Sequence, residues 1–181
     1  MSEPRTIQLA FPGQILPSDS LEAYYSFDDG TATDQSGNGR NGTVEGATYT
    51  RAGESRGCLS FDGVDDYVSF PRITLSRTGS AISFRVNVRD FTDPVDGVDG
   101  VTLFRDSSLA YHKFIALFAD RVEIETNTNQ PRYRFYRTFN EDDTYHIVIT
   151  LSDDEASVYV NGGIVGSPQT LNDDIDIDRI G

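Results

Sequence analysis

The segment from residue 132 to residue 137 alternates arginines with aromatic residues. Successive side chains of a strand point to opposite faces of a sheet, so Arg132, Arg134 and Tyr136 would lie together on one face. Guanidinium groups can hold the carboxylates of acidic sugars, and a phenol ring can stack on a sugar ring. We therefore expect these three residues to bind a ligand. The alternative is an exposed sheet face whose arginines balance the acidic residues around them.

Two polar segments carry the oxygen ligands that calcium prefers. The first is a glycine-rich loop with Asp28, Asp29, Asp34 and Asn38, and the second is a later turn with Asp62, Asp65 and Asp66. The four residues of the loop are our candidate ligands for a structural calcium ion. The alternative is that these short side chains accept backbone N–H groups in tight turns and add to a solvated acidic surface.

Carboxylates at alternate positions also occur near the end of the sequence, at Asp174, Asp176 and Asp178. A retaining glycosidase needs two carboxyl groups about 5–5.5 Å apart, one of them kept protonated by apolar surroundings. The simpler interpretation buries the intervening isoleucines and leaves the aspartates in solvent. Glu123 and Glu125 invite the same interpretation, as a solvent-facing row.

The histidines give no better case for catalysis. His112 and His146 are the two in the sequence, and no nucleophile motif surrounds either of them. Two histidines without cysteine partners also make a poor zinc site. We therefore predict that the protein is not an enzyme.

The charged residues are unusual in kind as well as in number. The 181 residues carry a formal net charge of −14, with 21 aspartates against 8 glutamates and 14 arginines against one lysine. Such a surface lacks the clustered cations that hold a phosphate backbone, so we expect no nucleic-acid partner. We interpret the pattern as adaptation to high salt, where charges are screened within about 3 Å near 1 M. The alternative is a GC-rich genome combined with the ordinary acidity of secreted carbohydrate-binding domains.

Cys58 is the single cysteine, so it forms no internal disulfide, and we expect it to be a small core residue. The first residues lack the charged-then-apolar pattern of a signal peptide, and no apolar stretch approaches the roughly 18 residues of a membrane span. We therefore expect a chain that is neither exported on its own nor inserted into a membrane.

Short strands separated by glycine, asparagine and aspartate predict an antiparallel β-sandwich with little helix. The clearest alternation is at Ile82, Phe84, Val86 and Val88, and at Tyr145, Ile147, Ile149 and Leu151. Asn161-Gly162 between two apolar runs predicts a hairpin turn of type I′. Residues 1–20 indicate an arm for docking, with a strand from Thr6 to Phe11, and residues 21–181 indicate the main domain.

Seven stretches of this main domain carry a resemblance to a known family. They lie at residues 25–30, 34–42, 59–68, 82–86, 145–150, 158–162 and 178–181, in the family's order. Together they resemble the LamG-like jelly-roll family, whose fold is also called laminin-G-like or concanavalin-A-like. The resemblance implies an all-β, antiparallel two-sheet jelly-roll sandwich, and it implies calcium bound near such loops.

Two departures from the family pattern matter. Tyr25 stands where the family has tryptophan, which weakens a sugar site built on tryptophan stacking. The family also continues beyond the position of Gly181 into a closing strand. Three arrangements would complete the sheet: the strand of the arm fills the place, the protein continues past Gly181, or a neighbouring chain supplies the strand.

These features favour a surface-exposed domain that binds a glycan or a glycoprotein receptor. The predicted fold is typical of extracellular proteins, the sequence shows no signal peptide, and its surface is adapted to salt. This combination fits a structural protein in the virion of a virus that infects a halophilic archaeon, such as a capsid decoration, turret or tail component. The expected partners are host-surface glycans and other virion subunits, including copies of the chain itself. The alternatives are a purely structural assembly module and an accessory carbohydrate-binding module of an enzyme.

Overall fold

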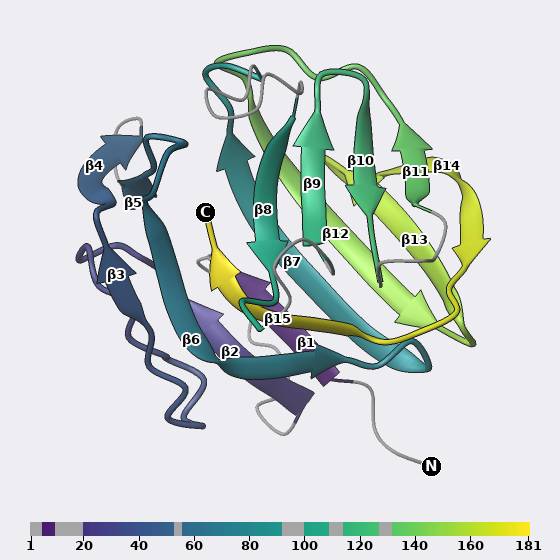
Figure 1. Cartoon of the computed structure of the whole chain (residues 1–181), viewed down its shortest axis with the longest axis horizontal. Helices are drawn as coiled ribbons and strands as arrows, with labels where there is room; N and C mark the ends of the chain where they lie inside the picture. Colours follow the sequence, from purple (N-terminus) through teal and green to yellow (C-terminus); the bar gives the residue numbers. More distant parts are fainter. Residues whose placement is uncertain (1–4, 10–19, 53–55, 92–99, 109–113, 127–131) are drawn as a thin grey trace.

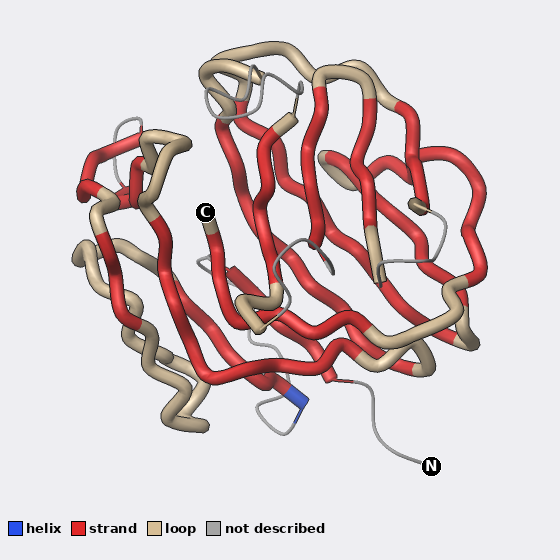
Figure 2. The backbone as a smooth tube through the Cα atoms, viewed as in Figure 1, coloured by secondary structure: helices blue, strands red, loops and turns tan. Residues whose placement is uncertain are grey.

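Strands account for most of the described part of the chain, which comprises residues 5–9, 20–52, 56–91, 100–108, 114–126 and 132–181 of a computed structural model. Figure 2 shows these strands in red, with almost no helix. The predicted all-β class with little helix is therefore confirmed. Within this part of the chain, no helix has the length and apolar character needed to cross a membrane.

Two sheets face each other (Figure 1). Sheet A consists, in spatial order, of β14 (Gly163–Thr170), β13 (Glu155–Val160), β12 (Thr144–Ser152), β7 (Gly79–Asn87), β1 (Arg5–Leu9) and β2 (Leu21–Tyr25). Sheet B consists of β11 (Tyr133–Tyr136), β10 (Arg121–Ile124), β9 (Phe114–Phe118), β8 (Val101–Arg105), β15 (Ile175–Ile180), β6 (Tyr67–Leu75) and β3 (Thr43–Glu45). A separate hairpin consists of β4 (Thr48–Ala52) and β5 (Arg56–Ser60).

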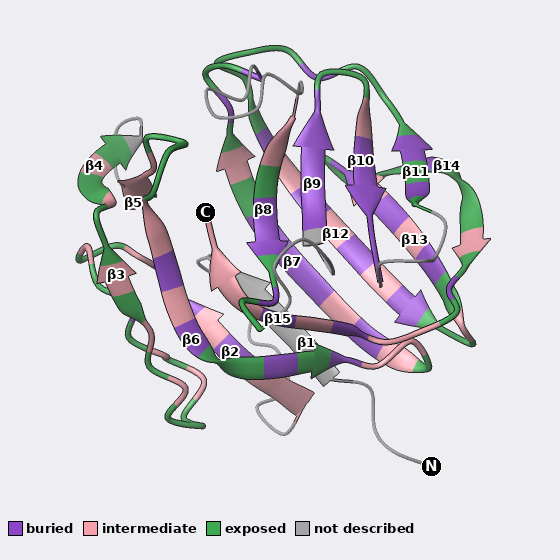
Figure 3. Ribbon diagram, viewed as in Figure 1, coloured by how far each residue is buried: buried purple, intermediate pink, exposed green. Residues whose placement is uncertain are grey.

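The core lies between sheets A and B, where alternate residues of both are buried (Figure 3). Every second residue of β12 is buried, namely Tyr145, Ile147, Ile149 and Leu151. Ile82 and Phe84 of β7 enter the same core, and the ring of Phe84 meets the ring of Phe104 of β8 edge to face, 5.0 Å between centroids. The two predicted alternating segments therefore form central strands of the sandwich.

Two tight turns set the register of β12, β13 and β14. Asn161 and Gly162 have φ angles of 51° and 82°, and they join residues that pair across the hairpin. Positive φ at both central residues defines a type I′ turn, whose twist matches the twist of the strands. The predicted turn is therefore confirmed. Asp153 and Asp154, with φ of 52° and 65°, make the equivalent turn between β12 and β13.

Backbone conformation and burial set the ends of two further strands. Strands β3 and β4 are separated at Gly46, whose φ of 76° interrupts an extended backbone. Strand β6 continues beyond Phe70 to Leu75. The continuation buries two further apolar side chains, Ile73 and Leu75, and this burial stabilises the longer strand.

Strand β1 lies within sheet A, between β7 and β2, and it runs parallel to both (Figure 1). The pairings of β7 with β12, of β12 with β13 and of β13 with β14 are antiparallel. The expected strand from Thr6 to Phe11 is thus observed over Arg5–Leu9, and its last two residues lie outside the described part. The division into an arm of residues 1–20 and a domain of residues 21–181 stays a prediction.

Candidate functional site

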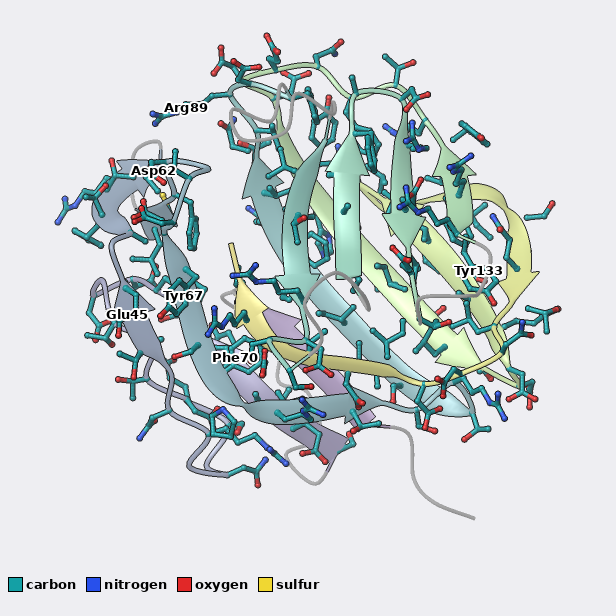
Figure 4. The ribbon with its side chains drawn as sticks, in the orientation of Figure 1. Glu45, Asp62, Tyr67, Phe70, Arg89 and Tyr133 are labelled. Carbon is teal, nitrogen blue, oxygen red and sulfur yellow. The ribbon has the colours of Figure 1, made fainter. Side chains whose placement is uncertain are left out.

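The outer face of sheet B carries the row of arginine and tyrosine side chains. Tyr133 and Phe135 of β11 are buried in the core, whereas Arg134 and Tyr136 are exposed, as is Arg132 just before the strand. Figure 4 shows Tyr133 on β11, at the end of the molecule opposite Asp62. Strand alternation therefore brings the three predicted ligand-binding residues to one face, and their binding role stays a prediction.

Glu123 of β10 lies at the centre of this face. Its side chain is 0% exposed, although the buried core residues of β10 lie on the other face. Arg134, its partner across the strand pair, donates from Nε to Glu123 Oε2 at 2.8 Å, and Arg121 donates to the same oxygen at 3.0 Å. Arg132 Nη1 lies 3.3 Å from Oε1. One buried carboxylate therefore interacts with three guanidinium groups.

Further contacts order the arginines around Glu123. The guanidinium group of Arg121 lies 3.7 Å from the centroid of the Phe118 ring, a cation–π geometry. Arg132 also lies 3.7 Å from a carboxylate oxygen of Glu125. The hydrogen bond to Glu123, followed by the charge of that carboxylate, raises the pKa of Arg134. These guanidinium groups are therefore charged and restricted in position.

The prediction of a solvent-facing glutamate row is wrong, because Glu123 on β10 and Glu125 just after this strand are 0% and 4% exposed. The long side chains of Arg132 and Arg134 reach over the shorter glutamates while they remain 50% and 44% exposed themselves. Alternation within one strand cannot reveal such a cover, since it comes from the neighbouring strand. Pairing the Arg-x-Glu-x-Glu run of β10 with the Arg-x-Arg run before Tyr136 as a hairpin would have indicated it.

Tyr136 completes the face. Its side chain is 64% exposed, and it pairs in register with Arg121 of β10. Strand β11 is at the edge of sheet B, and Gln169 of β14 donates to the backbone carbonyl of Arg134 at 2.6 Å. This bond ties the edges of the two sheets together beside the face. The result is an exposed aromatic ring next to positioned guanidinium groups, an arrangement suited to stacking and hydrogen bonding with a sugar.

The glycine-rich loop after β2 folds back along that strand. The carboxylate of Asp34 accepts four hydrogen bonds of 2.9–3.0 Å, donated by the backbone N–H groups of Tyr24, Ser36 and Arg40 and by the Ser36 hydroxyl. The amide of Asn38 donates to two carbonyl groups of β2. The loop therefore covers the outer edge of β2, which would otherwise be an exposed edge of sheet A.

The same hydrogen bonds bear on the candidate calcium ligands. Asp29 accepts the N–H and the hydroxyl of Thr31 at 3.0 and 2.7 Å, and Asp28 is exposed. A calcium ion at Asp28, Asp29, Asp34 and Asn38 would have to displace the bonds that Asp29 and Asp34 already accept. The four residues thus fit an ordered loop better than a metal cage, and calcium binding stays a prediction.

A different acidic group has converging oxygens. The carboxylate oxygens of Asp62, Asp65 and Asp66 lie within 4.8 Å of one another. Among the described residues, this is the group of acidic side chains close enough together to hold a metal ion. Asp62 accepts the N–H of Val64 at 2.8 Å, and Asp66 accepts the N–H of Asp62 at 2.9 Å. The bond from Val64, the largest cause, lowers the pKa of Asp62. Figure 4 shows Asp62 beside the β4–β5 hairpin, so the group lies far from β11.

The aspartates near the end of the sequence have structural partners. Ile175 and Ile177 of β15 are buried, which confirms the interpretation that the isoleucines point inward. On the other face, Asp176 accepts the hydroxyl of Thr74 at 2.6 Å. Asp178 accepts both the N–H and the hydroxyl of Ser107. These carboxylates therefore connect β15 to β6 and to the segment after β8.

Three further residues were singled out in the sequence. His146 on β12 lies 3.0 Å from the hydroxyl of Ser83, and burial, followed by the charge of Arg85, lowers its pKa. Cys58 is half-buried in β5 and outside the core cluster, contrary to the expected core position. His112 lies outside the described residues.

The strand pairing and the core between the sheets define a two-sheet β-sandwich, as the sequence predicts, and its pairings are antiparallel except for the two made by β1. Among five solved chains that match this structure is domain 4 of AbnA, a GH43 extracellular arabinanase from Geobacillus stearothermophilus, solved in complex with arabinotriose. The TM-score is 0.61 at 17% sequence identity, over 88% of this chain and 82% of that chain. At this identity the likeness shows the fold. No protein-family profile and no curated protein matches the sequence.

Proposed function

We propose that this protein is a surface-exposed, non-enzymatic domain of the LamG-like type that binds a glycan. The observation that supports the proposal most is the β11 row, in which exposed Arg132, Arg134 and Tyr136 stand beside the buried Glu123. Binding normally costs the rotamer entropy of long side chains. Because Glu123 already restricts the arginines, less of that entropy is lost when a ligand binds.

The chemistry of the row suits sugars. A guanidinium group has five N–H donors in one plane, which is more than one carboxylate accepts. Hydroxyl or carboxylate groups of a sugar can therefore hydrogen bond to the row while Tyr136 stacks on the ring. The arabinotriose in the structure of the neighbouring fold supports a glycan as the class of ligand. We favour an acidic glycan because the row presents cations.

The finer proposal concerns the setting of the domain. The net charge of −14 with a single lysine supports a protein that works in high salt. We propose a structural protein of the virion of a virus of a halophilic archaeon, in a capsid decoration, turret or tail. Its partners would be host-surface glycans and other virion subunits.

A second candidate function is an accessory carbohydrate-binding module of an enzyme. The fold likeness to one domain of an arabinanase favours it. The genes that surround the coding sequence distinguish the two settings, because virion genes would support the first and a catalytic domain in the same polypeptide would support the second.

Isothermal titration calorimetry in molar KCl tests the glycan site. The ligands are arabinan, polygalacturonate and glycans from a haloarchaeal envelope. We expect binding to at least one of them, and about tenfold weaker binding by Tyr136→Ala and by Arg134→Ala, as is common for central contacts.

Arg51→Ala is the matched control, since Arg51 is an exposed arginine on β4, outside both sheets. This variant should bind like the unaltered protein. Absence of binding to every glycan would overturn the proposed function, and equal binding by all variants would overturn the β11 site.

A further inference from the structure

Strand β1 holds an unusual place in sheet A. It is the only neighbour of β2 in the described sheet, so the connection of β2 to β7 runs through five residues, Arg5–Leu9. Both pairings of β1 are parallel, and its register against β2 shifts between Thr6 and Ile7. Backbone hydrogen bonds of this kind are available to any extended segment of suitable length.

The place that β1 fills cannot stay empty. Its walls carry Ala23 and Tyr25 on β2 and Ile82 and Phe84 on β7, all between 0% and 4% exposed. If β1 left, both walls would show unpaired backbone groups, and the core beneath them would meet water. Any departure of β1 must therefore be matched by the arrival of another strand.

The chain between β1 and β2 limits how β1 reaches its place. Two adjacent parallel strands need a crossover of about a dozen residues or more, because the chain must return to the starting end of the sheet. Eleven residues, 10–20, separate the end of β1 from the start of β2 in the sequence, and they include Pro12 and Pro17. If β1 pairs within its own chain, the connection is at the lower limit of this length. If β1 pairs with another molecule, the chain does not have to return to the starting end of the same sheet.

We propose that β1 is exchanged between two copies of this chain, so that the arm of each copy fills the place between β2 and β7 of the other. The occupant is a second copy because each molecule brings one arm and one matching place, so that every arm that leaves is matched by an identical arm that arrives. The exchange adds no new strand pairing, and a two-fold axis closes it as a dimer.

Single cysteines test this exchange in the full chain. Thr6 and Ala81 are partners in the β1–β7 register, and paired positions on adjacent strands lie within the Cα separation that a disulfide spans. Two proteins are made in a Cys58→Ser background, one with Thr6→Cys and the other with Ala81→Cys. They are mixed and concentrated in molar KCl, which screens the charge of −14 on each copy, and are then oxidised.

We expect a disulfide between the two chains, formed several-fold more than in a control mixture and increasing with protein concentration. The control replaces Ala81→Cys with Ser167→Cys, an exposed position on β14 at the far edge of sheet A. Non-reducing electrophoresis and mass spectrometry with one chain labelled by nitrogen-15 identify the product. An interchain yield no higher than that of the control overturns the exchange.

A third protein carries Thr6→Cys and Ala81→Cys in the same chain. In dilute solution it should form the disulfide within one molecule, since β1 then fills its own place. Failure of this disulfide as well would overturn the position of β1 on which the proposal rests. None of these outcomes depends on glycan binding.

Discussion

Glu123 shows how the position of a carboxylate in a hairpin can decide its role. On the face of β10 that points away from the core it would be expected in water, yet the arginines across and beside it cover it completely. Burying one carboxylate is favourable only where cations and donors replace water, and here three guanidinium groups do so. The arginines in turn remain partly exposed, so their own hydration is retained.

Replacing Glu123 with glutamine removes the charge but retains the size of the side chain. We expect Glu123→Gln to destabilise the fold by about 1–3 kcal/mol, because the guanidinium groups then repel one another without a counter-ion. Urea denaturation measures the loss. The exposed Glu155→Gln on β13 is the control and should change stability by less than about 0.5 kcal/mol. An unchanged midpoint for Glu123→Gln would show that the ion pairs contribute nothing.

At the scale of elements, the loop after β2 works as a cover for an edge strand. Burial raises the pKa of Asp34, but the hydrogen bonds from Tyr24, Ser36 and Arg40 outweigh it, and the pKa lies below its usual value. A carboxyl group whose pKa is lower in the folded state stabilises the fold above the pKa of the unfolded state, about 3.9. That stabilisation is lost as the pH falls through the lower, folded value.

Asp34→Asn tests this role of the loop. Asparagine retains one acceptor oxygen, so at least one loop donor loses its partner, and we expect a loss of about 1–2 kcal/mol at pH 7. The difference from the unaltered protein should narrow below about pH 4, because there the unfolded chain of the unaltered protein binds a proton at Asp34 before the folded chain does. Urea midpoints at several pH values give the comparison. Asp65→Asn is the exposed control, and a pH-independent difference would contradict the argument.

How far the sequence predicts these elements depends on where the controlling contacts come from. The alternation of β12 and the Asn161-Gly162 turn are local patterns, and both appear in the structure as predicted. The burial of Glu123 depends on another strand of the hairpin, and the parallel place of β1 depends on β7, more than seventy residues away. Strand alternation predicted that Arg132, Arg134 and Tyr136 share one exposed face. It did not predict that the buried carboxylate of Glu123 restrains the two arginines.

At the scale of the whole molecule, the acidic surface should make stability depend on salt. A net charge of −14 produces self-repulsion that is weaker in the expanded chain, so screening favours the folded state. We expect the melting temperature to rise by several degrees between 0.1 M and 2 M KCl, followed by circular dichroism. An equal concentration of a neutral osmolyte, such as sucrose, separates screening from general solute effects. A flat curve in KCl would contradict a surface adapted to high salt.

The place of β1 also determines the order in which the molecule can be completed during synthesis. Residues 5–9 leave the ribosome well before residues 79–87, the strand against which they pair. Until then β2 has no link to the rest of its sheet, and its apolar side chains have no core to enter. Strand β1 can therefore take its place in the sheet only after more than seventy further residues have been made, and until then the β1–β2 pair has no core to cover.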